Sequence, residues 1–156
     1  NITSGGLGTM GFALPAAIGA KYGAPDRTVV AVIGDGGFQM TLQELGTIMQ
    51  FGVAVKILIL NNSFLGMVRQ WQELFHENRY SFVNIQSPDF VQVAKGYGIA
   101  GKTVSQRQEL LPAVKEMLDH PGSYLLEVKV GKENNVFPMV PQGRGVAEII
   151  LSKEEL

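Results

Sequence analysis

Two polar side chains in this sequence have the types and spacing of a metal–anion site. Asp35 stands between Gly34 and Gly36, and Asn62 ends the pair Asn61-Asn62, 27 positions further on. A carboxylate and an amide oxygen are hard ligands that suit Mg²⁺ or Ca²⁺ better than zinc. The glycines let an anion approach the backbone closely. The alternative is that Asp35 caps a helix and that the asparagine pair forms an ordinary turn.

Both residues are expected at the ends of neighbouring strands. Residues 28–33 are a continuous β-branched run that predicts a strand buried on both faces, and residues 53–60 predict a second buried strand. A helix is expected between them, over residues 38–51. Parallel sheets bind ligands at the carboxyl ends of their strands, and one strand–helix–strand unit separates Asp35 from Asn62. We interpret the pair as a clamp for Mg²⁺ and a diphosphate, with N–H groups of the following helix facing the anion.

The other segments alternate in the same way. Helical patterns cover residues 11–23, 65–75 and 105–120, a helix-start signature stands at 87–90, and short strands are expected at 100–104 and 124–130. This alternation predicts an α/β fold, a three-layer α/β/α arrangement around a mostly parallel sheet. We expect a diphosphate- and metal-binding domain over residues 1–131 and a C-terminal tail or lid over 132–156. Because the chain opens abruptly in a glycine-rich loop, we interpret it as a piece of a longer polypeptide.

Composition narrows the class of protein. The 156 residues carry a formal net charge of −1, so nothing favours nucleic acid or an anionic membrane as a partner. The sequence has no cysteine, which excludes disulfides and thiolate metal sites. Its apolar runs are too short for a membrane span, and no signal-peptide pattern opens the chain. We therefore expect a cytoplasmic protein.

The two strand ends together match a known motif. The letters "GDG" at 34–36 followed by "NN" at 61–62 resemble the diphosphate-binding motif of thiamine diphosphate-dependent enzymes. The resemblance implies that Asp35 and Asn62 coordinate the metal ion. It also implies that the backbone carbonyl of Phe64 is the third protein ligand, which does not depend on the side chain at that position.

Three longer segments sharpen the resemblance. They are "TSGGLGTMGFALPAAIGA" at 3–20, "NNSFLGMVRQWQELF" at 61–75 and "ENNVFPMVPQGRG" at 133–145. Together they resemble the C-terminal thiamine diphosphate-binding domain of acetohydroxyacid synthase (acetolactate synthase) catalytic large subunits. The resemblance implies thiamine diphosphate and Mg²⁺ as cofactors, FAD held mainly by missing domains, and pyruvate and 2-oxobutanoate as substrates. It also implies a homodimer or higher oligomer and a regulatory small subunit.

The resemblance gives roles to several side chains. Met10 would be the wedge beneath the thiamine ring, and Met67, Val68 and Trp71 would shape the substrate pocket. Structural alternatives stay open: a core methionine at position 10, the buried stripe of an amphipathic helix at 67–71, and plain core for Met40. The expected catalytic residues are Met10, Met67, Val68 and Trp71. The expected cofactor-binding residues are Gly8, Thr9, Met10, Gly34, Asp35, Gly36, Gly37, Met40, Asn62, Phe64, Leu65, Gly66 and Met67.

The implied reaction joins two 2-oxo acids with loss of carbon dioxide, in branched-chain amino-acid biosynthesis. It needs a glutamate from the pyrimidine-binding domain of a partner subunit, and no residue of this chain matches that glutamate. We therefore expect the chain to be inactive alone. Two alternatives stay open: another thiamine diphosphate enzyme (glyoxylate carboligase, pyruvate oxidase or a 2-oxo acid decarboxylase), or a cofactor-binding module without chemistry. Trp71 and the tail motif at 137–145 favour the acetohydroxyacid synthase interpretation.

Overall fold

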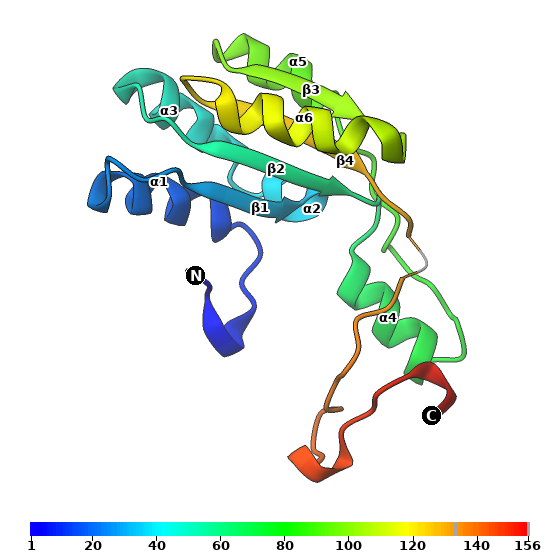
Figure 1. The fold of residues 1–156 in the computed structure, drawn as a ribbon. Coiled ribbons are helices and arrows are strands. Elements are labelled where there is room, and N and C mark those ends of the chain that lie inside the picture. Colours follow the sequence, from blue (N-terminus) through cyan, green and yellow to red (C-terminus); the bar gives the residue numbers. More distant parts are fainter. Residues whose placement is uncertain (133, 156) are drawn as a thin grey trace. The chain divides into compact units, whose positions relative to one another are not determined.

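A four-stranded parallel sheet forms the centre of the larger of two structural units (Figure 1). The computed structural model describes residues 1–132 and 134–155. The larger unit contains residues 1–63 and 86–130, and the smaller unit contains residues 64–85 and 131–156. The sheet and both strand ends of the predicted clamp therefore belong to one unit.

The strands of the larger unit lie in the order β1-β2-β4-β3, and each neighbouring pair is parallel. β1 spans Val30–Gly34, β2 spans Lys56–Asn61, β3 spans Ala100–Val104 and β4 spans Tyr124–Lys129. Helical segments follow each of the first three strands along the chain. The predicted α/β fold around a parallel sheet is confirmed.

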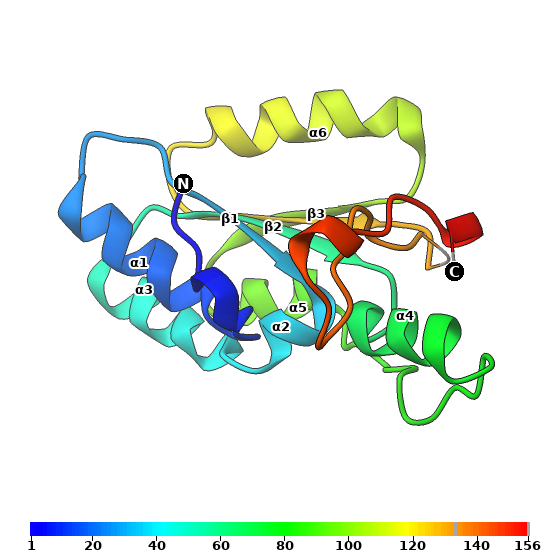
Figure 2. The same ribbon diagram turned by 90° about the horizontal axis from the view of Figure 1, so that it is seen from below.

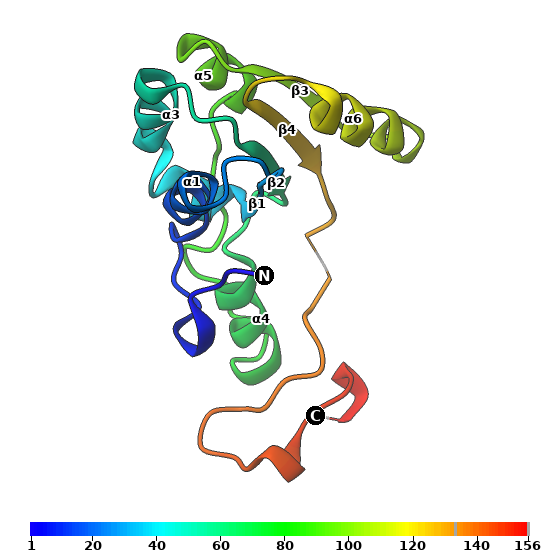
Figure 3. The same cartoon turned by 60° about the vertical axis from the view of Figure 1, so that its left-hand side comes forward.

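Helices cover both faces of this sheet (Figure 2). On one face lie α1 (Ala13–Gly23), α2 (Asp35–Gln39), α3 (Leu45–Phe51) and α5 (Phe90–Gly96), and on the other lies α6 (Arg107–Asp119). Figure 3 shows the same division from another side. The 3₁₀ turns η1 (Gly5–Leu7) and η2 (Leu42–Glu44) belong to the same unit. Within the described residues, no helix is both long enough and apolar enough to span a membrane.

Side chains of the strands alternate between two cores, because successive strand residues point to opposite faces. Ile57, Ile59 and Leu125 are fully buried in the larger core, which also contains side chains of α1, α3 and α5. Leu126 lies in the smaller core with Met117 of α6. Burying such an aliphatic side chain contributes about 1.5–3 kcal/mol. The two cores therefore fix the strands, and with them the loops at the carboxyl ends of the strands.

β1 departs from its predicted burial. Its sequence predicts a strand buried on both faces, but only Ala31 and Ile33 are buried, whereas Val30 and Val32 are 40% and 56% exposed. The reason is position in the sheet. β1 lies at one edge of the sheet, whereas α6, the helix on this face, packs on β3 and β4 at the other edge. The β-branched run thus indicates a strand without indicating how many faces are covered.

The helix expected over residues 38–51 is present in pieces. α2 begins earlier than predicted, at Asp35, and ends at Gln39, and helical structure resumes with η2 and α3. The break falls where the glycine-rich loop packs on the chain. There the hydroxyl of Thr41 donates to the carbonyl of Gly11 at 2.9 Å. The chain at residues 40–41 therefore serves as a docking point for the loop.

The smaller unit is built on α4 (Gly66–Phe75) and the C-terminal tail, residues 131–156. Isolated backbone bridges pair Phe64 with Asn84, and Met139 with Ile150. The 3₁₀ turns η3 (Val146–Glu148) and η4 (Lys153–Glu155) lie near the end of the described tail (Figure 3). The lid role of the tail and its start at residue 132 stay predictions.

Candidate functional site

Asp35 is a buried carboxylate at the carboxyl end of β1. It is the first residue of α2 and is only 1% exposed. Its Oδ2 accepts a hydrogen bond from the backbone N–H of Ser63 at 3.1 Å and another from the hydroxyl of Ser87 at 3.3 Å. Two donors from distant parts of the chain therefore hold this carboxylate in one orientation.

The turn after β2 brings Asn62 to the same edge. Gly34 pairs with Leu60 in the sheet, so Asp35 and Asn61 follow at neighbouring strand ends. Ser63, two residues after the end of the strand, has a left-handed backbone with φ +59°. Its N–H is shared between Asp35 at 3.1 Å and the Oδ1 of Asn61 at 3.0 Å. The predicted meeting of the two strand ends is therefore observed, and half-buried Asn62 stands within this turn.

The first asparagine of the pair points back into the sheet. The Nδ2 of Asn61 donates to the Oε1 of Glu127 on β4 at 2.7 Å. Glu127 is 3% exposed and also accepts from Lys129 at 2.6 Å and from the hydroxyl of Thr103 at 2.7 Å. Burial alone would raise the pKa of Glu127, but these three hydrogen bonds outweigh it and lower the pKa below its ordinary value.

Sequence reasoning missed Glu127, Ser63 and Ser87. A signal exists only for Glu127, which interrupts the otherwise apolar stretch "YLLEV" at 124–128. A lone charge in a buried strand needs partners, and those partners depend on the register of three strands. Ser63 and Ser87 act on Asp35 through tertiary contacts that no local pattern shows.

The glycine-rich loop is docked beside α2. Gly11 is buried with φ +83°, and a Cβ there would lie 3.1 Å from the side chain of Thr41 and 3.2 Å from that of Met40. The N–H of Thr9 donates to the hydroxyl of Ser4 at 2.8 Å, which closes the loop on itself. A Cβ at Gly37 would lie 3.8 Å from the backbone nitrogen of Gly11, so the two glycine-containing motifs lie in contact range. The glycine-rich loop and the start of α2 therefore form one continuous surface.

Two methionines stand on this surface rather than in the core. Met10 is 43% exposed and Met40 is 54% exposed. The alternative that each is plain core is therefore wrong. A long thioether left partly exposed beside a glycine-rich loop is available to contact a ligand, as the wedge role of Met10 requires.

The smaller unit holds the other predicted residues. Leu65 donates its N–H to Val83 at 2.8 Å, and Gly66 begins α4. Met67 and Val68 are 50% and 47% exposed. The half-buried ring of Trp71 packs on Phe75 with 4.9 Å between ring centroids.

The alternative of a buried stripe at 67–71 is wrong for its first residues, because α4 buries Gln70 instead. Gln70 is 2% exposed and makes two hydrogen bonds to the backbone of Val136. Its Oε1 accepts the N–H of Val136 at 2.6 Å, and its Nε2 donates to the carbonyl at 3.0 Å. The two hydrogen bonds pair the Gln70 amide with both backbone groups of Val136, as a neighbouring strand would. They hold the tail against α4.

Glu73 makes a second link between α4 and the tail. Its Oε1 accepts from Lys153 at 2.6 Å and from Asn135 at 3.2 Å, while its Oε2 accepts from Arg69 and Tyr80, both at 3.2 Å. The hydrogen bond from Lys153 is the main cause that lowers the pKa of Glu73, and it outweighs the effect of burial. A charged hub therefore joins the tail to the helix that carries Met67 and Val68.

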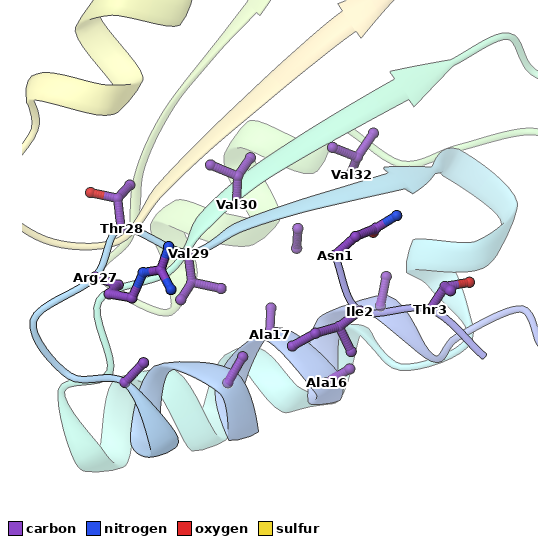
Figure 4. A pocket seen from close by; sticks show the side chains of 14 residues that line it. Asn1, Ile2, Thr3, Ala16, Ala17, Arg27, Thr28, Val29, Val30 and Val32 are labelled. Carbon is purple, nitrogen blue, oxygen red and sulfur yellow. The ribbon is translucent and has the colours of Figure 1, made fainter. Parts of the chain in front are cut away.

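A groove of about 680 Å³ lies elsewhere in the larger unit, along the outer edge of β1 (Figure 4). Ala16 and Ala17 of α1 form one wall, Val30 and Val32 another, and the N-terminal residues such as Ile2 a third. None of the predicted site residues lines it. Its lining is mostly aliphatic, so it offers no constellation for chemistry.

The chain belongs to the thiamine pyrophosphate enzymes. The family description "Thiamine pyrophosphate enzyme, C-terminal TPP binding domain" matches residues 1–128. This match covers the glycine-rich loop, both strand ends and all of the sheet except the last residue of β4. The strand-end geometry is thus found in a domain of a class that binds this diphosphate cofactor.

Curated relatives narrow the class further. The chain is 50% identical over 149 residues to "Acetolactate synthase catalytic subunit, mitochondrial" of Saccharomyces cerevisiae, covering 96% of this chain and 22% of that one. It is 46% identical over 150 residues to "Acetolactate synthase isozyme 2 large subunit" of Escherichia coli, covering 96% and 27%. It is 45% identical over 151 residues to "Acetolactate synthase" of Arthrospira platensis, covering 96% and 26%. The chain therefore spans about a quarter of the length of these relatives.

A solved structure agrees on the fold. The chain is similar to the thiamine diphosphate-dependent 4-hydroxybenzoylformate decarboxylase of Rhodococcus jostii RHA1, with a TM-score of 0.75 and 33% identity. The likeness covers 81% of this chain and 24% of that chain.

The residues at the sheet edge fit a divalent cation held together with a diphosphate. Asp35 is oriented by two donors, Asn62 stands on a fixed turn, and a Cβ at Gly34 would meet no atom within 4 Å. Mg²⁺ usually takes one or two carboxylates and completes its shell with phosphate oxygens and water. The described residues contain no group of three or more His, Cys, Asp and Glu that could hold a metal.

Proposed function

We propose that this chain is the C-terminal thiamine diphosphate-binding domain of an acetolactate synthase. The complete enzyme would condense two pyruvates, or pyruvate and 2-oxobutanoate, with loss of carbon dioxide in branched-chain amino-acid biosynthesis. Identities of 45% and 50% to relatives named acetolactate synthase support this over the other thiamine diphosphate enzymes. The decarboxylase neighbour, at 33%, supports only the wider class.

The observation that carries the proposal is the joined edge of β1 and β2. The N–H of Ser63 ties the turn that contains Asn62 to the buried carboxylate of Asp35. A turn that only reversed the chain would not need a buried carboxylate as its anchor. The arrangement supports a cation shared by both residues.

Each part of the clamp has a physical task in this proposal. Asp35 and Asn62, with the backbone carbonyl of Phe64 that the resemblance adds, would be the protein ligands of Mg²⁺, and the ion would supply positive charge for a diphosphate. Gly34, Gly36 and the rest of the glycine-rich surface let the diphosphate approach the backbone. When bound, thiamine diphosphate supplies the electron sink for decarboxylation, while the protein supplies binding and orientation.

The exposed apolar side chains act on the organic part of the cofactor and on substrate. Met10 would contact the thiamine ring of the bound cofactor. Met67, Val68 and Trp71 would shape the pocket for the second 2-oxo acid, and the tail would act as its lid and exclude water. The exposure of Met10, Met67 and Val68 supports these roles, because a buried side chain could not contact a ligand.

Further properties of the complete enzyme belong to the same proposal. We infer FAD as a second cofactor, a homodimer or higher oligomer, and a cytoplasmic location. The words "large subunit" in the name of the Escherichia coli relative support a smaller regulatory subunit. No nucleic acid or membrane partner is proposed.

Product analysis tests the function directly. The protein expressed from its complete gene is incubated with pyruvate, thiamine diphosphate and Mg²⁺, and its products are identified by NMR. We expect 2-acetolactate, and a mixed product when 2-oxobutanoate is added. Acetaldehyde alone would indicate a decarboxylase, and no product would indicate a cofactor-binding module. The 156 residues alone are expected to be inactive, because the required glutamate is not among them.

A further inference from the structure

Glu127 is a buried charge for which the proposed function supplies no role. It lies on β4, is 3% exposed, and faces the same side of the sheet as Ile59, its partner in the register. A buried carboxylate is costly unless every lone pair finds a donor. A hydrophobic side chain at this position would avoid that cost, so the charge calls for an explanation.

The contacts of Glu127 lead to the metal clamp. Its Oε1 accepts from the Nδ2 of Asn61 at 2.7 Å. Asn61 then accepts, through Oδ1, the N–H of Ser63 at 3.0 Å and its hydroxyl at 3.2 Å. The same N–H reaches the Oδ2 of Asp35 at 3.1 Å. A continuous hydrogen-bonded path therefore runs from Glu127 on β4, through the turn after β2, to the end of β1.

An ionised carboxylate can only accept hydrogen bonds, so Glu127 determines which way the Asn61 amide faces. With its Nδ2 turned to Glu127, Asn61 presents its carbonyl oxygen to Ser63. That bond supports Ser63 in the left-handed region at φ +59°, which is unfavourable for a residue with a Cβ. The backbone of Asn61 is held as well, because its carbonyl accepts the N–H of Val130 at 2.9 Å.

Lys129 and Thr103 complete the support. Lys129 donates to the Oε1 of Glu127 at 2.6 Å and balances its charge, and Thr103 on β3 donates to Oε2 at 2.7 Å. Side chains of β2, β3 and β4 thereby hold the carboxylate of Glu127 in place. Glu127 in turn orients the turn after β2. Substituting a group that orients a metal ligand in this way typically lowers the metal affinity by about 10–100-fold.

We propose that Glu127 is a positioning residue for the metal clamp: through Asn61 it sets the turn that presents Asn62 to Mg²⁺. This inference rests on the proposed function, because it needs a metal at Asp35 and Asn62. It adds a third strand, β4, to the parts of the fold that determine cofactor binding. Glu127 itself contacts neither metal nor cofactor.

Three variants test this role in the protein expressed from its complete gene. Glu127→Met keeps the volume and removes the acceptor, so Mg²⁺ affinity measured by calorimetry with excess thiamine diphosphate is expected to fall about tenfold or more. Glu127→Gln can still accept from Asn61 while donating to Thr103, so it is expected to keep most of the affinity. Tyr124→Phe is the matched control, since it lies on β4 and loses only the hydroxyl bond to Glu116 at 2.7 Å. It is expected to lower the melting temperature without changing Mg²⁺ affinity.

A double-mutant cycle separates positioning from general destabilisation. Asn61→Ala is expected to weaken Mg²⁺ binding as Glu127→Met does, and the two losses are not expected to add, because both act on one link. Should Glu127→Met fail to fold, Asn61→Ala carries the test alone. Wild-type Mg²⁺ affinity in Glu127→Met or in Asn61→Ala would overturn the inference. Absence of Mg²⁺ binding in the wild-type protein would instead overturn the proposed function, and the inference with it.

Discussion

At the scale of single residues, hydrogen bonds within the chain hold the two strand ends of the proposed clamp. The carboxylate of Asp35 already accepts from Ser63 and Ser87, and Ser63 already has its left-handed backbone. Strained backbone of this kind persists only where the surroundings hold it, and it is common at ligand clamps. A preorganised clamp spends little binding free energy on ordering its own groups.

Gly11 tests how closely the glycine-rich loop must dock. Gly11→Ala places a Cβ within 3.2 Å of Met40 and Thr41 at φ +83°, so we expect it to destabilise the fold by about 1–3 kcal/mol. Gly6→Ala is the control, because a Cβ at Gly6 would meet no atom within 4 Å. Thermal unfolding of both variants checks the prediction. Equal melting temperatures for the two variants would show that the loop does not dock as described.

The hub at Glu73 predicts a pH dependence for the tail. Because the folded-state pKa of Glu73 lies below its ordinary value of 4.5, chiefly through Lys153, its contribution to stability is complete above about pH 4.5. That contribution is lost as the pH falls through the lowered pKa. Hydrogen exchange of the tail, corrected for the intrinsic pH effect, should show protection decreasing below pH 4.5.

A Glu73→Gln variant is the control for this titration. It removes the titrating group, so the tail should be less protected at neutral pH and should change less with acid. Tail protection that is the same at pH 7 and pH 3 in the unsubstituted protein would argue against the hub.

The two residues of the motif could be predicted from the sequence, whereas their supports could not. Asp35 and Asn62 stand out because residue type, spacing and strand ends coincide in the linear chain. Glu127 reaches Asn61 only because β2 and β4 are neighbours in a particular register. Such a contact depends on tertiary structure, which no local pattern contains.

At the scale of elements, α4 buries polar side chains and exposes apolar ones, the reverse of an ordinary amphipathic helix. Its buried positions hold polar Gln70 and largely covered Glu73, while Met67 and Val68 are exposed. The polar side chains fix the tail, and the apolar ones remain available for a ligand. The helix thus holds the tail more than it contributes to a core.

Gln70→Leu tests the clasp on the tail. The substitution keeps a buried side chain but removes both hydrogen bonds to Val136, at a cost of about 1–3 kcal/mol for the polar groups left without their partner. We expect faster proteolysis and faster hydrogen exchange at residues 134–140. Gln50→Leu, an exposed change on α3, should leave both rates unchanged. Unchanged rates in Gln70→Leu would mean that the clasp does not hold the tail.

The elements themselves were largely predictable, with informative exceptions. The 100–104 and 124–130 strands and the helix at 65–75 lie within a residue of their predicted bounds. The helix expected over 38–51 is interrupted at residues 40–41, where Gly11 docks, and β1 has an exposed face because α6 packs on β3 and β4. Both exceptions come from packing partners distant in sequence.

At the scale of the whole molecule, the chain matches one domain of the thiamine pyrophosphate enzymes, the C-terminal cofactor-binding domain. It covers 22–27% of the acetolactate synthases to which it is 45–50% identical. The parallel sheet positions the clamp at one edge, as ligand sites in such sheets generally are.

The central claim is that Asp35 anchors a Mg²⁺-dependent thiamine diphosphate site. Calorimetric titration of thiamine diphosphate into the protein expressed from its complete gene, with and without Mg²⁺, tests it most directly, with Asp35→Asn beside the wild type and Asp89→Asn as the control. Asp89 caps α5 through a hydrogen bond from Gln92, a role that asparagine also fills. We predict Mg²⁺-dependent binding that is lost in Asp35→Asn and kept in Asp89→Asn. Binding that is independent of Mg²⁺, or unchanged in Asp35→Asn, would contradict the account.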